Sequence, residues 1–206
     1  MRLLILALAA VAASASTARG QLFYVGVRAG AAVPTGDFAA TSGATGNDAL
    51  VTGATPGLAY GLDGGIGLGL LGFYGAYEKV QFGCKSSACP RTGKAQLTGV
   101  SAGVRVRAIL IPLFKPWVKA GVTYNEMKVT SPNSSSGVAY TTNKTPGLEA
   151  GAGIDIPVLG GFFNLTPQVR YVRQKMKPRT SSTTTLSKRS ADYYTFDIGL
   201  RLRSPI

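Results

Sequence analysis

The segment Y-T-F-D-I-G-L-R-L, residues 194–202, alternates strictly between apolar and polar residues. Successive side chains of a β-strand point to opposite faces, so this alternation predicts a strand with one apolar and one polar face. The polar face carries Thr195, Asp197, Gly199 and Arg201. The architecture of the whole chain depends on which of the two faces lies inside the protein.

Seven further segments alternate in the same way and are the other candidate strands. They are Phe23–Val33, Leu58–Gly69, Phe73–Phe82, Val100–Ala108, Val118–Asn125, Leu148–Ile156 and Phe163–Tyr171. Their polar faces consist largely of charged residues and glycine, which are too hydrophilic for the interior of a soluble sandwich. We therefore expect the apolar faces to contact lipid. In the third segment the adjacent Glu78 and Lys79 leave the facing open.

The connections between these segments alternate between long and short. Long connections span Thr35–Pro56, Gly83–Ala95, Met127–Pro146 and Gln174–Ala191, and short ones span Leu70–Gly72, Pro112–Pro116 and Leu159–Gly161. A sheet that spans a membrane must close, because unpaired backbone groups in hydrocarbon cost several kcal/mol each. The sequence predicts an all-β fold, an eight-stranded antiparallel up-and-down transmembrane β-barrel with short periplasmic turns and long extracellular loops. The last strand is expected to pair with the first, and Trp117, near a short turn, to lie at the membrane interface.

The amino-terminal residues have the pattern of a secretory signal peptide. This pattern consists of the positive Arg2, the apolar core Leu3–Ala13 and the small residues Ser16–Ala18 at the cleavage site, with Ala13–Ala15 as an alternative site. We expect residues 1–18 to be the signal peptide and residues 19–206 to form one barrel domain. Elsewhere the chain contains no apolar run of about 18 residues, so helical membrane spans are not expected.

The chain is strongly basic, with a formal net charge of +13, which falls by one to +12 when the signal peptide and Arg2 are removed. A basic chain raises nucleic acid as a partner, but export argues against it. We expect contacts with outer-membrane lipid. For the basic residues of the last long connection we expect a solvated loop, and the alternative is contact with lipopolysaccharide phosphates. The candidate contact residues are Lys175, Lys177, Arg179, Lys188 and Arg189.

The two cysteines, Cys84 and Cys89, lie in one polar segment of a chain that we expect to be exported. An even number of closely spaced cysteines in such a chain favours a disulfide that staples a loop. A metal site would need further ligands, and the chain has no histidine and no third cysteine. We expect a Cys84–Cys89 disulfide and neither a metal nor a cofactor.

The signal peptide, the eight alternating segments, the loop asymmetry and the terminal Y-x-F-x-I-x-L-x-L together resemble the small outer-membrane β-barrel superfamily. This eight-stranded group includes the OmpA membrane domain, OmpX and OmpW-like proteins, and the resemblance covers Leu22–Arg203. Members commonly end on an aromatic residue, whereas this chain continues through Ser204, Pro205 and Ile206. The resemblance implies a monomer in a Gram-negative outer membrane, inserted by the barrel-assembly machinery.

The absence of histidine bears directly on function. Barrel enzymes such as lipid A acyltransferases and deacylases, phospholipases and omptin-like proteases resemble one another in relying on an active-site histidine. No nucleophile motif appears either, so we expect a non-enzymatic protein with a structural or surface-interaction role. The alternatives are a narrow porin-like channel for small or anionic solutes and a secreted lipocalin-like ligand-binding barrel.

Charged side chains gather on the inward faces of the predicted strands. They are Arg28, Asp63, Arg105, Arg107, Lys119, Glu149, Asp155, Arg170, Asp197 and Arg201. The interior of an eight-stranded barrel is just wide enough for side chains to fill, and opposite charges buried together avoid the cost of burying either alone. We expect a salt-bridged plug with Arg28, Asp63 and Asp197 in one network. The alternative is that the surplus of basic residues lines a path for anions.

Overall fold

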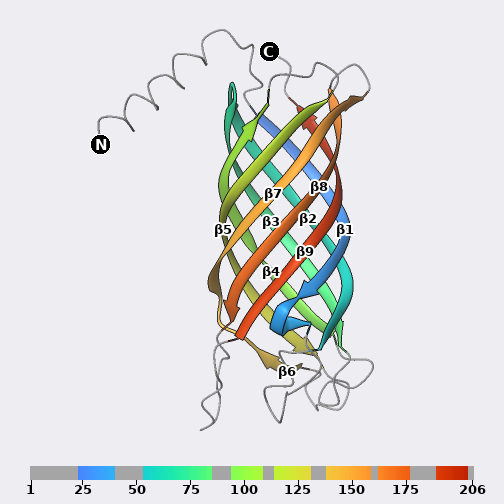
Figure 1. Cartoon of the computed structure of the whole chain (residues 1–206), viewed down its shortest axis with the longest axis vertical. Coiled ribbons are helices and arrows are strands. Elements are labelled where there is room, and N and C mark those ends of the chain that lie inside the picture. Colours follow the sequence, from blue (N-terminus) through green and yellow to red (C-terminus); the bar gives the residue numbers. More distant parts are fainter. Residues whose placement is uncertain are drawn as a thin grey trace, which may run out of the picture.

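The computed structural model describes residues 23–39, 53–84, 94–108, 114–130, 138–158, 162–176 and 189–203. These residues form one antiparallel sheet that closes into a barrel (Figure 1). The wall strands are β1 (Phe23–Thr35), β2 (Ala54–Leu68), β3 (Leu71–Cys84), β4 (Lys94–Arg107), β5 (Lys115–Thr130), β7 (Thr145–Val158), β8 (Phe163–Met176) and β9 (Arg189–Arg203). A short strand, β6 (Val138–Thr141), pairs with the end of β5, and a 3₁₀ helix, η1 (Gly36–Phe38), follows β1. The predicted signal peptide lies outside the described residues.

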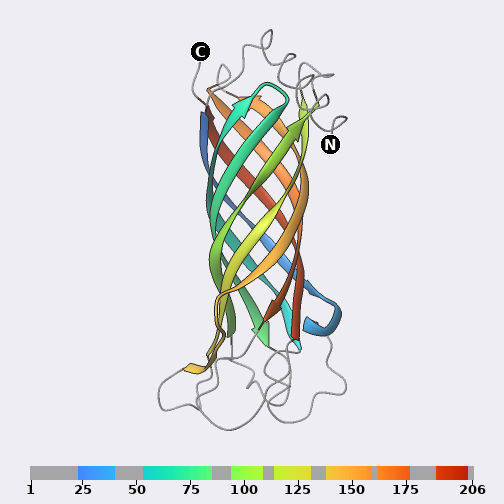
Figure 2. The same cartoon turned by 90° about the vertical axis from the view of Figure 1, so that its left-hand side faces the viewer.

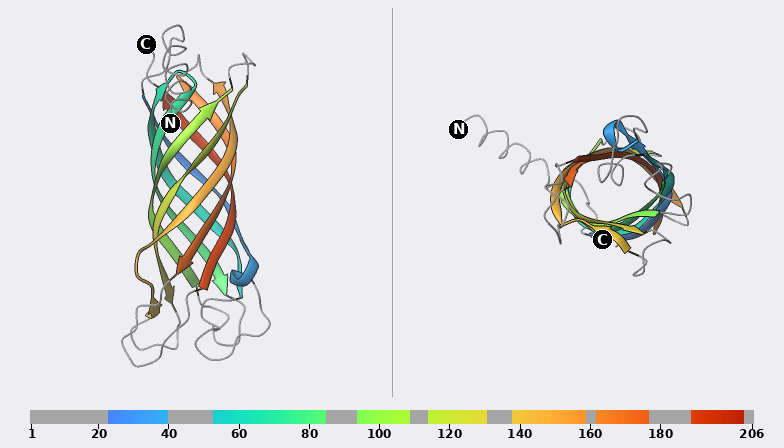
Figure 3. Two further views of the ribbon diagram at one scale, coloured as in Figure 1. Left: turned by 60° about the vertical axis from the view of Figure 1, so that its left-hand side comes forward. Right: turned by 90° about the horizontal axis from the view of Figure 1, so that it is seen from below.

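Closure of the barrel comes from the pairing of β1 with β9. Their register runs from Tyr24 opposite Arg203 to Thr35 opposite Asp192. Figure 2 shows the tilt of the strands, and Figure 3 shows the closed ring seen along the barrel. The pairing of the last strand with the first and the eight-stranded up-and-down barrel are therefore confirmed. Among the described residues, no helix is long and apolar enough to cross a membrane.

The outer face of the wall is apolar along most of its length. Leu148 on β7 and Ile198 on β9 are each 63% exposed, whereas the neighbouring Glu149 and Asp197 point into the barrel and are each 3% exposed. A soluble barrel needs the opposite arrangement, because water must then meet its outer face. The predicted polarity, with apolar side chains outside and charges inside, is confirmed.

Two rings of aromatic side chains bound this apolar band. Near the short turns the outward aromatic residues are phenylalanines: Phe23, Phe73, Phe114 and Phe162. Toward the long connections they are tyrosines, which we call the tyrosine ring: Tyr60, Tyr77, Tyr124, Tyr171 and Tyr194. Phe114 and Tyr124 are ten positions apart. At about 3.3 Å per residue and a tilt of about 40°, this spacing gives a height of about 25 Å, as expected for the band that faces lipid. The prediction for Trp117 is wrong: it is 3% exposed inside the lumen, because alternation places it on the same face as Lys119.

Beyond the tyrosine ring the alternation reverses its polarity. On β5, Glu126 and Lys128 face outward, whereas Met127 and Val129 are fully buried inside the barrel. The prediction of a loop from Met127 to Pro146 is therefore wrong at its start, since β5 continues to Thr130. The physical reason is that a wall above the lipid meets water outside and must pack apolar side chains inside. Strands β3, β4 and β8 also extend past their predicted bounds at this end.

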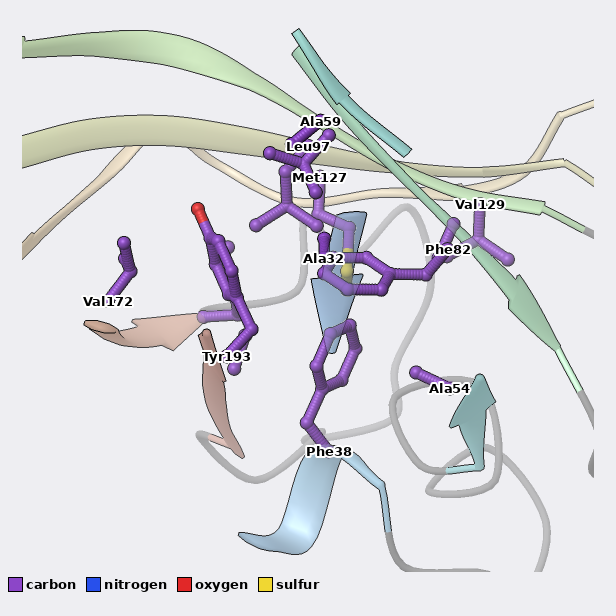
Figure 4. Packing of buried hydrophobic residues seen from close by; sticks show 14 residues of the cluster. Ala32, Phe38, Ala54, Ala59, Phe82, Leu97, Met127, Val129, Val172 and Tyr193 are labelled. Carbon is purple, nitrogen blue, oxygen red and sulfur yellow. The ribbon is translucent and has the colours of Figure 1, made fainter. Parts of the chain in front are cut away.

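The reversed alternation fills the loop end of the lumen with apolar side chains, which we call the mouth cluster (Figure 4). Its members are Ala32, Phe38, Ala54, Ala59, Val80, Phe82, Ala95, Leu97, Met127, Val129, Val172, Met176, Ala191 and Tyr193. Phe38 reaches in from η1 and packs edge-on against Phe82, with 5.0 Å between ring centroids. Phe82 in turn packs against Tyr193 at 5.4 Å. The mouth cluster therefore joins η1 to the inner faces of every wall strand except β7.

Candidate functional site: the charged lumen

Ten charged side chains of the described residues are buried in the lumen, and their charges balance. The basic ones are Arg28, Arg105, Lys119, Arg170 and Arg201, and the acidic ones are Asp63, Glu78, Glu149, Asp155 and Asp197. Nine of the ten belong to the constellation that the sequence indicates. The remaining member of that constellation, Arg107, is only half-buried. The fully buried set, with five charges of each sign, is formally neutral.

Arg170 on β8 is the centre of the larger group of ion pairs. Its guanidinium donates to Glu149 at 3.2 Å and to Asp197 at 3.1 Å, and it lies 2.8 Å from Glu78. Arg28 on β1 bridges two of these carboxylates, at 3.0 Å from Glu78 and 3.2 Å from Asp197. Because these five residues come from β1, β3, β7, β8 and β9, their ion pairs tie opposite sides of the wall together.

Aromatic side chains complete this group. Lys119 forms an ion pair with Glu149 at 3.2 Å and lies 4.4 Å from the centroid of the Tyr74 ring, while the Tyr74 hydroxyl donates to Glu149. The Tyr193 hydroxyl donates to Glu78 at 3.3 Å. Tyr193 also belongs to the mouth cluster, so the ionic and apolar layers of the lumen share this side chain.

A second group of ion pairs lies nearer the short turns. Asp155 accepts from Arg105 at 2.6 Å, from Arg201 at 3.2 Å and from the indole N–H of Trp117 at 3.0 Å. Arg201 also lies 2.7 Å from Asp63. The Arg105 guanidinium stacks 4.1 Å from the centroid of a Trp117 ring, so this cation contacts both an anion and an aromatic face.

Glycines on neighbouring strands make room for these long side chains. Gly26 on β1 lies between Asp63 on β2 and Arg201 on β9, and Gly61 on β2 lies between Arg28 and Glu78. A Cβ at Gly26 would approach the Arg201 Cγ to 2.6 Å. The glycine rows therefore let charged side chains lie across a neighbouring strand and reach partners two strands away.

This spacing explains why one predicted pair does not form. The expected partnership of Asp63 with Arg28 is wrong, because Arg28 lies opposite Gly61 and Gly199, whereas Asp63 lies in the row of Gly26 and Arg201. Asp63 is accordingly paired with Arg201. The expected pairing of Arg28 with Asp197 does form.

Glu78 is the buried charge that sequence reasoning leaves unassigned. The structure turns Glu78 inward, at 2% exposure, and Lys79 outward. Charge balance could have identified it, because the predicted constellation holds six basic and four acidic residues. A buried network tends toward neutrality, so the carboxylate rather than the ammonium of this adjacent pair should face the lumen.

The other candidate residues are only partly within the described chain. Lys175 is exposed on β8 and Arg189 begins β9, whereas Lys177, Arg179 and Lys188 lie outside the described residues. Cys84 ends β3, and Cys89 also lies outside the described residues. The disulfide and the lipopolysaccharide contact of these basic residues stay predictions.

Two solved structures of other proteins have the same fold as this chain. The crystal structure of Neisserial surface protein A matches with a TM-score of 0.62 and 17% identity, over 88% of this chain and 97% of that one. The outer membrane protein AlkL, solved by solid-state NMR in lipid bilayers, matches with a TM-score of 0.53 and 14% identity, over 93% and 94%. No curated protein sequence matches the chain. A family model described as the outer membrane protein beta-barrel domain matches residues 3–203, and the chain accordingly belongs to this family of the outer membrane.

Proposed function

We propose that the protein is a non-enzymatic, monomeric barrel, inserted by the barrel-assembly machinery, that has a structural or surface-interaction role and does not conduct. The observation that carries this proposal is the burial of the lumen charges. Arg170 is 1% exposed and Asp155 is fully buried, although both lie on the inner face of the wall. A continuous aqueous path along the lumen would leave such side chains in contact with water.

The balance of charge argues against the anion-selective alternative. A path for anions needs a surplus of cationic side chains that are available to a passing solute. In the described lumen the five buried basic residues meet five buried carboxylates, and each forms an ion pair with at least one of them. An anion would have to displace these carboxylates from their partners.

The mouth cluster supports closure at the other end. An ion entering from the loop side would have to pass apolar side chains such as Phe38 and Leu97, each 1% exposed, and lose its hydration there. The apolar layer and the ionic layer therefore oppose conduction by different physical means. A secreted lipocalin-like barrel is excluded as an alternative by the apolar outer face.

The proposal that the protein is not an enzyme is supported by the hydrogen bonds and ion pairs that the buried acidic side chains already form. Glu149, for example, accepts from Tyr74, Lys119 and Arg170 at once, which leaves it unsuited to act as a base. Incubation of the folded protein with phospholipid and lipid A, followed by mass spectrometry of the lipids, is expected to show unchanged masses.

Conductance of the refolded mature chain in a planar bilayer tests the main proposal. We expect no discrete current steps under conditions in which a channel-forming porin gives them. The variant Phe38→Ala, which thins only the mouth cluster, is expected to remain silent because the ionic layer is intact. Reproducible current steps from the unaltered chain that change in size in Phe38→Ala would overturn the proposal in favour of a narrow channel.

A further inference from the structure

Three lysines stand on the outside of the wall, just beyond the tyrosine ring. Lys79 on β3 is half-buried, and Lys94 on β4 and Lys128 on β5 are exposed. They share this stretch of outer wall with other polar side chains. We call the group the lysine patch, and it consists of Lys79, Gln81, Lys94, Gln96, Thr98 and Lys128.

The strand register brings the patch together. Lys79 lies opposite Thr98, and Lys128 lies opposite Gln96, which in turn lies opposite Gln81. Lys94 follows one outward position beyond Gln96 on β4. Since adjacent strands are about 4.8 Å apart and residues about 3.3 Å apart along a strand, this register places the Cα atoms of the three lysines roughly 8–14 Å from one another on three neighbouring strands.

The lysines of the patch lack anionic partners within the described chain. One carboxylate, Glu126, lies opposite Thr98 on this outer wall, and within the described residues it forms no ion pair with Lys79, Lys94 or Lys128. Arg173 on β8 differs, because it lies 3.9 Å from Asp192, which also accepts from the Tyr171 hydroxyl at 3.2 Å. The lysine patch is thus an outward basic surface whose lysines form no ion pair within the described chain.

The layers below the patch fix its depth in the membrane. Val104 and Val100 face outward along β4, and Val100 lies between Tyr77 of β3 and Tyr124 of β5. The next outward row is that of Lys79 and Thr98. The order from aliphatic through tyrosine to lysine matches the order from acyl chains through the interface to the headgroups.

We propose that the lysine patch binds the phosphates of a phosphorylated glycolipid in the outer leaflet. Lysine ammonium groups pair strongly with phosphate, and the amide and hydroxyl groups of Gln81, Gln96 and Thr98 suit the hydroxyls of a sugar headgroup. The site differs from the loop residues that the sequence indicates, because it is built on rigid strands beside the acyl chains. It is independent of whether the lumen conducts.

Binding of purified lipid A to the folded barrel in zwitterionic nanodiscs tests this site. The variant Lys79→Gln/Lys128→Gln removes two charges from the patch, and the control Arg173→Gln removes one from the β8 rim. We expect the patch variant to bind diphosphorylated lipid A about thirtyfold more weakly, at roughly fivefold per charge lost. The control is expected to change affinity less than about threefold, because Asp192 already offsets Arg173. The variant Lys79→Arg/Lys128→Arg should restore binding.

Three results would overturn the proposal. They are unchanged lipid A affinity in the patch variant, an equal or larger loss in the β8 control, and equal affinity of the unaltered protein for lipid A without phosphates. Heat-modifiable gel mobility establishes that each variant is folded before it is scored. Because conductance is measured separately, a failed lysine patch leaves the closed-lumen proposal intact, and a conducting lumen leaves the patch intact.

Discussion

Replacement of Arg170 by methionine tests whether the ion pairs of the lumen hold the wall together. Arg170 is 1% exposed and pairs with Glu78, Glu149 and Asp197. Methionine keeps the length and the apolar stem but removes the charge, so the buried set changes from neutral to a net charge of −1. Removing one partner of a buried ion pair typically costs about 3–5 kcal/mol, because the remaining charge stays buried without compensation.

The structure places the expected loss at the low end of this range. Arg28 still forms ion pairs with Glu78 and Asp197, and Lys119 still forms one with Glu149, so each of the three carboxylates keeps a basic partner. We expect a loss of about 3 kcal/mol, which is roughly a hundredfold change in the unfolding equilibrium. Arg173→Met on the same strand is the control: its side chain is 63% exposed and 3.9 Å from Asp192, so it should cost at most about 1 kcal/mol.

Urea unfolding of the barrel in lipid vesicles, followed by heat-modifiable gel mobility, measures both free energies of unfolding. The double variant Arg170→Met/Glu78→Gln restores formal neutrality in the lumen, so it should lose less stability than the sum of the two single variants. The reasoning is refuted if Arg170→Met and Arg173→Met are equally stable, or if the double variant is additive. Either result would mean that water or lipid headgroups already compensate the lumen charges.

Three further outcomes follow from the packing and from the cysteine spacing. Gly26→Ala should destabilise the barrel by about 1–3 kcal/mol in the same assay, because the new Cβ would lie 2.6 Å from the Arg201 Cγ. Gly75→Ala is the control. Its new Cβ would lie 3.9 Å from the nearest atom, so its stability should be within about 0.5 kcal/mol of that of the parent. Phe38→Ala should lower the free energy of unfolding by about 3 kcal/mol, the low end for truncation of a buried phenylalanine, and Phe38→Leu should lower it less. Equal stability of Phe38→Ala and the parent would show that η1 does not hold the mouth closed. Thiol labelling of the exported protein in denaturant should modify Cys84 and Cys89 only after reduction, and labelling without reductant would remove the predicted disulfide.

The alternation of residues was sufficient to predict the strands, and also which face lies inside, wherever charged and aliphatic residues alternate along a strand. On β4, for example, the order Val104, Arg105, Val106 allows one arrangement in a membrane. The facing was left open where two charges adjoin, at Glu78 and Lys79, because a period of two must then put one charge outside. The outward Lys79 is tolerated because it stands past the tyrosine ring, and that boundary depends on the whole wall rather than on its neighbours.

The partners inside the lumen were less predictable than the facing. Adjacent strands were expected to supply the pairs, but the pairs of Arg28 with Glu78 and of Arg105 with Asp155 join strands that are not hydrogen-bonded to each other. An arginine side chain is long enough to extend over a glycine on the adjacent strand, as Arg28 does over Gly61, and to reach a partner on the strand beyond. Its partner therefore depends on which paired positions of the adjacent strand hold glycine. Register is therefore required before the ion pairs can be assigned.

The reversal of polarity along β5 connects the fold to both proposals. Up to Tyr124 the outward residues are apolar and Lys119 and Asn125 lie inside, whereas beyond it Lys128 faces outward and Val129 is buried. The first part of the strand thus has the pattern expected where lipid surrounds the wall, and the second part has the pattern expected where water surrounds it. The change marks where the wall leaves the acyl chains. Inside the barrel, the reversal supplies the apolar mouth cluster above the ion pairs. Outside, it places the lysine patch at the level expected for the headgroups, so one change of pattern underlies both the proposed closure of the mouth and the proposed site for an anionic lipid.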